Sequence, residues 1–112
     1  DMRALAGSMP VHPHSGIGTV TVFTQGDVTF DDPTAGHGTI GYGGLEWARA
    51  GIGMWHGKEL SAGSSPMVHG FQLWIALPPE LERAEPEAQV GESLANRRRF
   101  LPELLRRAGG LV

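Results

Sequence analysis

The chain has 112 residues, a formal net charge of −3 and no cysteine. This length suits one small domain with a single core. The lack of cysteine excludes disulfides, thiolate metal ligands and thiol nucleophiles, and the acidic balance gives no overall signature of nucleic-acid binding. No apolar run is long enough for a membrane-spanning helix, and the first residues lack the apolar core of a signal peptide. We therefore expect a soluble protein, by default in the cytoplasm.

Two histidines separated by one residue, His12 and His14, precede an alternating run over residues 19–24. On an extended backbone, side chains at i and i+2 point to the same side, so one strand can offer both imidazoles to one metal ion. Neutral imidazole suits iron, copper, nickel and zinc. On spacing alone, an exposed pair that binds nothing is the favoured interpretation.

Short β-branched segments alternate with glycine-rich turns in the first two thirds of the chain. The first two segments are predicted to form an antiparallel hairpin around Gln25 and Gly26. The last and most apolar segment ends at Pro78 and Pro79, because proline cannot donate to a ladder. Such short strands and frequent turns predict an all-β sandwich or barrel. The main predicted strands cover residues 19–24, 27–31, 39–42, 45–50 and 68–77.

The pattern changes after Pro79. Residues 80–92 are acidic and interrupted by proline, as in a linker, whereas residues 93–112 are arginine-rich and carry apolar residues at helical spacing. Pro102 predicts a kink or the first turn of a second short helix. The arginines fit a solvated helix face better than a nucleic-acid site. We predict a β domain over residues 1–79, a linker over 80–92 and an amphipathic helical tail over 93–112.

Several motifs, met in order between about residues 10 and 79, resemble the pirin family. They are HPHSG at 12–16, TVT at 19–21, GDV at 26–28, EW at 46–47, AGIG at 50–53, the histidine at 56 and HGFQLWIALP at 69–78. This resemblance implies a cupin, an all-β double-stranded β-helix or jelly-roll-like barrel, here with a short α-helical C-terminal tail. Pirins usually hold iron inside the barrel and usually contain two cupin domains, the first of which bears the metal. The chain resembles that metal-bearing half.

The resemblance also implies a set of metal ligands. In the family pattern, a glutamate follows two residues after the third histidine, but Lys58 occupies that position here and Glu59 comes next. A regular strand would direct Lys58 at the metal, whereas a bulge at Gly57 would bring Glu59 inward. Two sites are open: three histidines with waters, or three histidines plus Glu59. The histidines implied as ligands are His12, His14 and His56.

Other residues have simpler expectations. Gly18 stands where cupins of this type commonly carry a glutamate, which predicts a site poor in acids. His37 is expected in a loop, and His69 is expected to form a hydrogen bond near the base of its strand. The aromatic residues expected in the core or the cavity wall are Trp47, Trp55 and Trp74.

The activity implied by the resemblance is the dioxygenation of a flavonol such as quercetin at a single divalent metal, first of all Fe(II), with nickel, copper, manganese or zinc as alternatives. Such a reaction needs a general base, for which Glu59 is the candidate. If Lys58 took that place instead, its charge would lower metal affinity and remove the base.

Two further interpretations belong to other functional classes. The first is a non-enzymatic, metal-dependent regulatory or binding module, since pirins are also described as transcriptional cofactors. The second is a reduced single-domain cupin that serves mainly in homo-oligomeric assembly, most simply as a dimer. The expected partners are a small aromatic substrate and another copy of the chain, and neither a membrane nor nucleic acid is expected.

Overall fold

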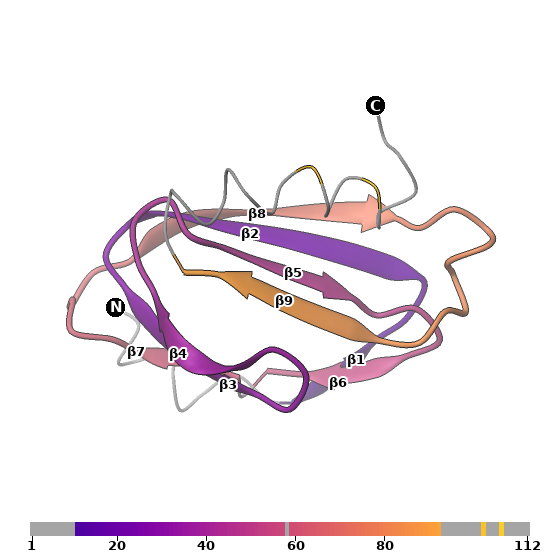
Figure 1. Cartoon of the computed structure of the whole chain (residues 1–112), viewed down its shortest axis with the longest axis horizontal. Helices are drawn as coiled ribbons and strands as arrows, with labels where there is room; N and C mark the ends of the chain where they lie inside the picture. The colour runs from indigo at the N-terminus through magenta and orange to yellow at the C-terminus, as the bar shows by residue number, and fades with distance from the viewer. Residues whose placement is uncertain (1–10, 58, 93–101, 103–105, 107–112) are drawn as a thin grey trace.

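The computed structural model describes residues 11–57, 59–92, 102 and 106. Residues 11–57 and 59–92 are all-β, as the sequence predicts, and their strands form three antiparallel sheets (Figure 1). No helix among the described residues is long and apolar enough to cross a bilayer. The helical tail predicted over 93–112 lies outside the described residues, apart from Pro102 and Arg106. The strands are β1 (His12–His14), β2 (Ile17–Gln25), β3 (Val28–Asp32), β4 (Gly36–Ile40), β5 (Leu45–Arg49), β6 (Met54–His56), β7 (Leu60–Ala62), β8 (His69–Ala76) and β9 (Glu87–Gly91).

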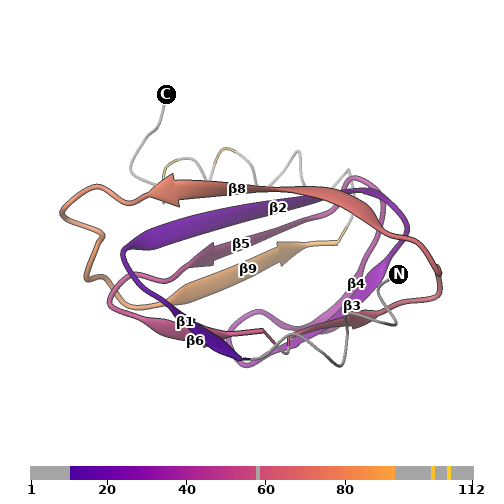
Figure 2. The same ribbon diagram turned by 180° about the vertical axis from the view of Figure 1, so that it is seen from behind.

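The strands lie in two layers. One layer is a four-stranded sheet in the order β8-β2-β5-β9, and opposite it lie the sheet β4-β3-β7 and the pair β1-β6 (Figures 1 and 2). An apolar cluster fills the space between the layers near β3 and β4. It consists of Phe23, Val28, Phe30 and Ile40, each at most 6% exposed. The pair β1-β6 lies toward the other end of this space (Figure 2).

A second apolar cluster lies on the outer face of the four-stranded sheet, where Trp47 packs with Leu45, Val20 and Val22. Side chains alternate along β2, so Val20 and Val22 face outward while Thr19 faces the barrel interior. Gly18 belongs to the outer face, because a Cβ there would lie 2.7 Å from the Trp47 ring. The expectation that Gly18 deprives the metal site of an acid is therefore wrong, because a side chain at this position would point away from the interior.

The predicted hairpin is not formed. Strand β2 pairs with β5 and β8, whereas β3 pairs with β4 and β7. The chain therefore passes from one layer to the other at the turn that was expected to join paired strands. Gly26 is required there, because its φ of +77° lies in the left-handed region and any side chain would collide with the Met67 carbonyl.

The linker predicted over residues 80–92 contains strand β9. This strand pairs with β5 along its whole length, and Ala88 is 6% exposed. Acidic and polar residues around Ala88 and Val90 hide a short alternating pattern, which is why composition suggests a linker here. Residues up to Gly91 therefore belong to the sheet.

Two histidines outside the pair β1-β6 have ordinary surroundings. His37 lies in strand β4 and is exposed, so the loop predicted for it is wrong. His69 begins β8, and its backbone carbonyl accepts a hydrogen bond from Thr24 Oγ1 at 3.3 Å. The hydrogen bond expected near the start of this strand is thus made by the main chain of His69.

Candidate metal centre

The strand pair β1-β6 gathers three histidines. Its antiparallel register places His12 opposite His56 and His14 opposite Met54. The ring centroids of His12 and His14 are 4.7 Å apart, and each lies 5.6 Å from the ring centroid of His56. The structure thus brings together the three histidines that the sequence singles out, because two come from one face of a strand and the third lies directly across the ladder.

Their spacing can be compared with that of ligands around one ion. At metal–nitrogen distances of about 2.1 Å, imidazoles that share an ion have ring centroids roughly 5 Å apart. His12 and His14 meet this spacing, and the His56 ring is about half an ångström too far. As the side chains stand, no group of three or more His, Asp or Glu residues in the described part of the chain could hold a metal ion. The donor types fit a transition metal, and binding requires the His56 ring to move toward the other two.

The surroundings of His14 favour its neutral form. Burial lowers its pKa, and the neighbouring His12 and His56 lower it further. The neutral imidazole is the form that binds metals, so this shift favours ligation at neutral pH. The edge of the Trp74 ring packs on His14, with ring centroids 5.2 Å apart.

Trp74 is held in place by a short chain of polar contacts. Its indole Nε1 donates to Gln72 Oε1 at 2.8 Å, and Gln72 Nε2 donates to Thr21 Oγ1 at 3.0 Å. Trp74 therefore forms part of the wall beside His14, as the sequence predicts for a tryptophan of this domain. Trp47 is fully buried in the core, and Trp55, although 69% exposed, lines a depression beside His14, so both positions agree with the prediction of core or cavity wall.

A small pocket of about 10 Å³, room for about one water molecule, opens beside His14 and His56. Its remaining lining is small or apolar and comes from Ile17, Thr19, Ala48, Ala50 and Met54. A wider depression of about 450 Å³ also reaches His14 and is rimmed by Ile52 and Trp55. A ligand near the three imidazoles would therefore meet a mainly apolar surface.

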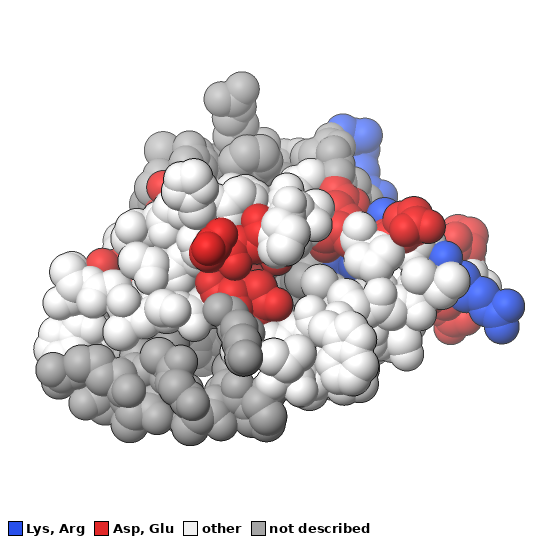
Figure 3. All heavy atoms as spheres, turned by 90° about the horizontal axis from the view of Figure 1, so that it is seen from below, with Lys and Arg blue, Asp and Glu red and all other residues white. Residues whose placement is uncertain are grey.

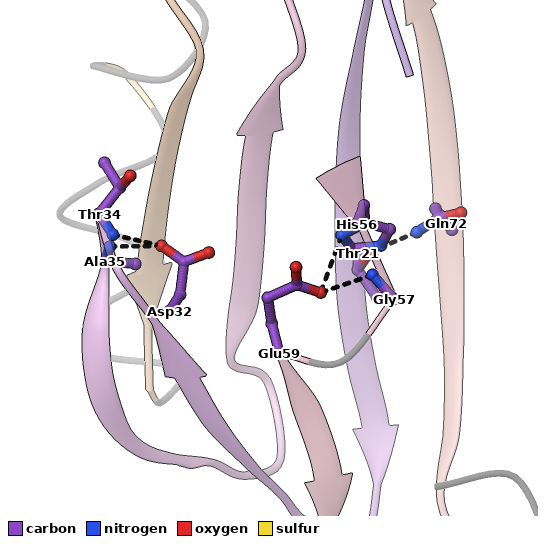
Figure 4. A network of polar contacts seen from close by, with 8 residues as sticks. All are labelled: Thr21, Asp32, Thr34, Ala35, His56, Gly57, Glu59 and Gln72. Carbon is purple, nitrogen blue, oxygen red and sulfur yellow. Dashed lines mark hydrogen bonds and ion pairs between the residues drawn. The ribbon is translucent and has the colours of Figure 1, made fainter. Parts of the chain in front are cut away.

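Glu59 approaches His56 after a turn at Gly57. Gly57 has a φ of +138°, and its N–H donates to Glu59 Oε2 at 2.8 Å. The same oxygen lies 3.2 Å from His56 Nδ1 (Figure 4). The glycine thus brings Glu59 toward the histidines, as the bulge hypothesis requires. Lys58 lies outside the described residues.

Sequence reasoning missed a second carboxyl group near this site. Glu46 lies on the inward face of β5 with Ala48 and is 6% exposed. Burial raises its pKa to about 7, and the charges of Glu59 and Asp32 contribute. The available signal was a single acid within the apolar alternating segment 45–50, at a position that faces the interior.

Asp32 completes a group of three acids with Glu46 and Glu59. Its Oδ1 accepts hydrogen bonds of 2.7 Å from the backbone N–H groups of Thr34 and Ala35 (Figure 4). Acidic side chains gather near the centre of the face shown in Figure 3. Because Glu46 and Asp32 are buried, the interior is richer in acids than the sequence suggests.

The comparisons with known proteins agree with this architecture. Residues 2–75 match the family model described as Pirin. A pirin-like protein from Caulobacter vibrioides is 40% identical over 87 residues, which cover 78% of this chain and 31% of the relative. Pirin from Homo sapiens is 36% identical over 84 residues, which cover 74% of this chain and 28% of the relative. The chain thus spans about a third of the length of these relatives.

Solved structures also resemble the described strands of this chain. GK1651 from Geobacillus kaustophilus matches with a TM-score of 0.63 and 40% identity, over 75% of this chain and 33% of that chain. Quercetin 2,3-dioxygenase from Acinetobacter baumannii matches with a TM-score of 0.62 and 28% identity, over 71% of this chain and 26% of that chain. Because the family model covers more than half of the sequence, the chain belongs to the pirin family, and its described strands have the cupin fold of that family.

Proposed function

We propose that the chain binds one divalent transition-metal ion through His12, His14 and His56, with Fe(II) as the first candidate. The observation that carries this proposal is the gathering of three imidazole rings within 5.6 Å of one another on β1-β6. Three neutral imidazoles leave coordination positions open, as catalytic sites do and closed structural sites do not. Membership of the pirin family supports an ion at this place.

We further propose that the loaded protein acts on a small aromatic substrate of the flavonol type, as a dioxygenase. The likeness to quercetin 2,3-dioxygenase from Acinetobacter baumannii supports this reaction class. The exposed side chains of Ile52 and Trp55 offer an apolar surface beside His14. A bound divalent ion would supply Lewis acidity and open positions for substrate and dioxygen.

The protein's own acids supply the proton chemistry in this proposal. A flavonol hydroxyl must lose its proton to react, and a carboxylate close to the histidines is suited to accept it. Glu59 lies against His56, and Glu46 is buried in the same interior with a pKa of about 7. A group with such a pKa can both accept and return a proton near neutral pH.

Elemental analysis tests the metal site. The wild-type protein and a variant with both His12→Ala and His14→Ala are purified and dialysed together, beside a control with both His37→Ala and His69→Ala. We expect about one ion per chain in the wild type and the control, and a loss of the ion in the first variant. An absence of metal from the wild type, even after reconstitution with Fe(II) or Ni(II), would overturn the proposal.

Turnover then separates the enzyme from a second candidate, a metal-dependent binding module. The inner pocket of about 10 Å³ is far too small for a flavonol, which favours the module. Quercetin consumption under air by the iron-loaded protein, lost in the variant carrying both His12→Ala and His14→Ala, supports the dioxygenase. A loaded protein that leaves quercetin unchanged supports the module.

A cytoplasmic location is part of the same proposal, on the ground of the cysteine-free sequence.

A further inference from the structure

The carboxylate of Glu59 faces one particular atom of His56. Glu59 Oε2 lies 3.2 Å from Nδ1 of the imidazole, and it also accepts the Gly57 N–H at 2.8 Å. Figure 4 shows this carboxylate between the start of β7 and the imidazole ring. The nitrogen that faces Glu59 is engaged with a carboxylate, so Nε2 is the His56 nitrogen left for another partner.

This arrangement has a known chemical meaning in metalloproteins. A histidine that binds a metal through one nitrogen usually donates its other N–H to a carboxylate, carbonyl or water, which fixes the tautomer and the ring orientation. Glu59 Oε2 already accepts the Gly57 N–H and lies 3.2 Å from His56 Nδ1. Direct coordination through this oxygen would require both contacts to break, whereas coordination through His56 Nε2 leaves them in place.

We propose that Glu59 is a positioning residue and not the fourth ligand: it holds the proton of neutral His56 on Nδ1 and so presents Nε2 to the metal. This inference rests on the proposed metal site. It also gives a role to the three-residue spacing from His56 to Glu59. The positive φ of Gly57 turns the chain so that the carboxylate faces the Nδ1 side of the imidazole ring.

The environment of the pair suits this role. The side chains of His56 and Glu59 are 17% and 16% exposed, so water competes only weakly for their contact. A negative charge beside Nδ1 also makes the opposite nitrogen a better donor to a cation. Lys58, which occupies the family's acidic position in the sequence, then has no required part in coordination.

The tautomer of His56 is measured first, in metal-free protein labelled with ¹⁵N, by long-range ¹H–¹⁵N correlation. We expect wild-type His56 to carry its proton on Nδ1 and Glu59→Ala to move a substantial fraction to Nε2. Glu59→Gln keeps an oxygen acceptor and is expected to restore the Nδ1 form. The matched control is Glu80→Gln, an exposed acid outside the site. An Nε2 proton on wild-type His56 would overturn the proposal whether or not the protein binds metal.

The second measurement uses Co(II) as the probe and follows its visible absorption during titration. We expect Glu59→Ala to weaken Co(II) binding about 10- to 100-fold, and Glu59→Gln to bind more tightly than Glu59→Ala with the wild-type band positions. Shifted bands in Glu59→Gln would identify Glu59 as a ligand and refute the positioning role. If wild-type protein binds no Co(II) at all, the proposed function fails, and the tautomer still decides the contact between Glu59 and His56.

Discussion

The buried carboxyl group of Glu46 makes the stability of the folded chain depend on pH. Its pKa is raised to about 7 in the folded protein, from an ordinary value near 4.5, chiefly by burial. The folded state therefore holds this proton more tightly than the unfolded state does. It follows that the free energy of unfolding falls as pH rises from about 4.5 to about 7.

Replacing Glu46 with glutamine removes this penalty. Above pH 7, Glu46→Gln is expected to be more stable than wild type by up to about 3 kcal/mol, and the difference should vanish below about pH 4.5. Urea unfolding of the metal-free proteins with EDTA, at a series of pH values, measures it. A stability difference that does not change with pH would show that Glu46 is ionised freely in the folded state.

At Gly18, the addition of a single Cβ atom would disturb the packing of the core. A Cβ at this residue would lie 2.7 Å from the fully buried Trp47 ring, so the ring or the backbone would have to shift. We expect Gly18→Ala to lower the free energy of unfolding by about 1–3 kcal/mol, without changing the metal content of the folded protein. Gly41→Ala is the control, because the nearest atom to its Cβ would lie at 3.9 Å. Equal stability of the two variants would contradict the packing described for Trp47.

At the scale of elements, the alternation of side chains along a strand is predictable from the sequence, whereas the pairing of strands is not. The i, i+2 spacing of His12 and His14 predicts their common face, because a strand alternates wherever it lies. Their meeting with His56 depends on the β1-β6 register, which no local pattern contains. The family resemblance alone connected His56 with His12 and His14. For the site as a whole it left two alternatives, one with Glu59 and one without it.

The predicted hairpin failed for a related physical reason. A Gly26 turn with positive φ suits both a tight hairpin and a passage between sheets, and only the partners β5 and β8 decide between them. The buried acid Glu46 escaped notice because its neighbours on the inward face come from distant strands. Tertiary neighbours decide such cases, and a single sequence does not show them.

Strand β9 offers a direct test of where the domain ends. Ala88 faces the interior next to β5 and is 6% exposed. Ala88→Asp would bury a charge there, and we expect a loss of about 3 kcal/mol or more in unfolding free energy, or failure to fold. Thermal unfolding followed by circular dichroism measures this. A residue in a solvated linker would tolerate the change, so an unaltered melting temperature would contradict the assignment of β9.

At the scale of the whole molecule, strand β8 is the most conspicuous surface feature. It forms one edge of the four-stranded sheet and pairs only with β2 among the described strands. The exposed fractions of Phe71, Leu73 and Trp74 are 74%, 62% and 59%. An apolar edge strand of this length readily adds a strand from another chain, and antiparallel pairing with its own copy is self-complementary.

We therefore expect the chain to self-associate through β8. Sedimentation equilibrium should show a dimer whose population grows with concentration, and Leu73→Lys should shift it toward the monomer. Glu80→Gln serves as the control, because it changes the net charge by the same +1 in an exposed turn outside β8. A monomer at all concentrations, or equal dissociation in both variants, would exclude β8 as the contact.

The contact between Trp74 and His14 has an optical consequence. An indole whose ring centroid lies 5.2 Å from that of His14 is within easy quenching range of any paramagnetic ion that the imidazole binds. Because Trp74 is also largely open to solvent, its emission should report the arrival and departure of Fe(II), Ni(II) or Co(II) without a label. Under the proposed metal site, Trp74 would therefore act as a built-in fluorescent indicator of metal occupancy.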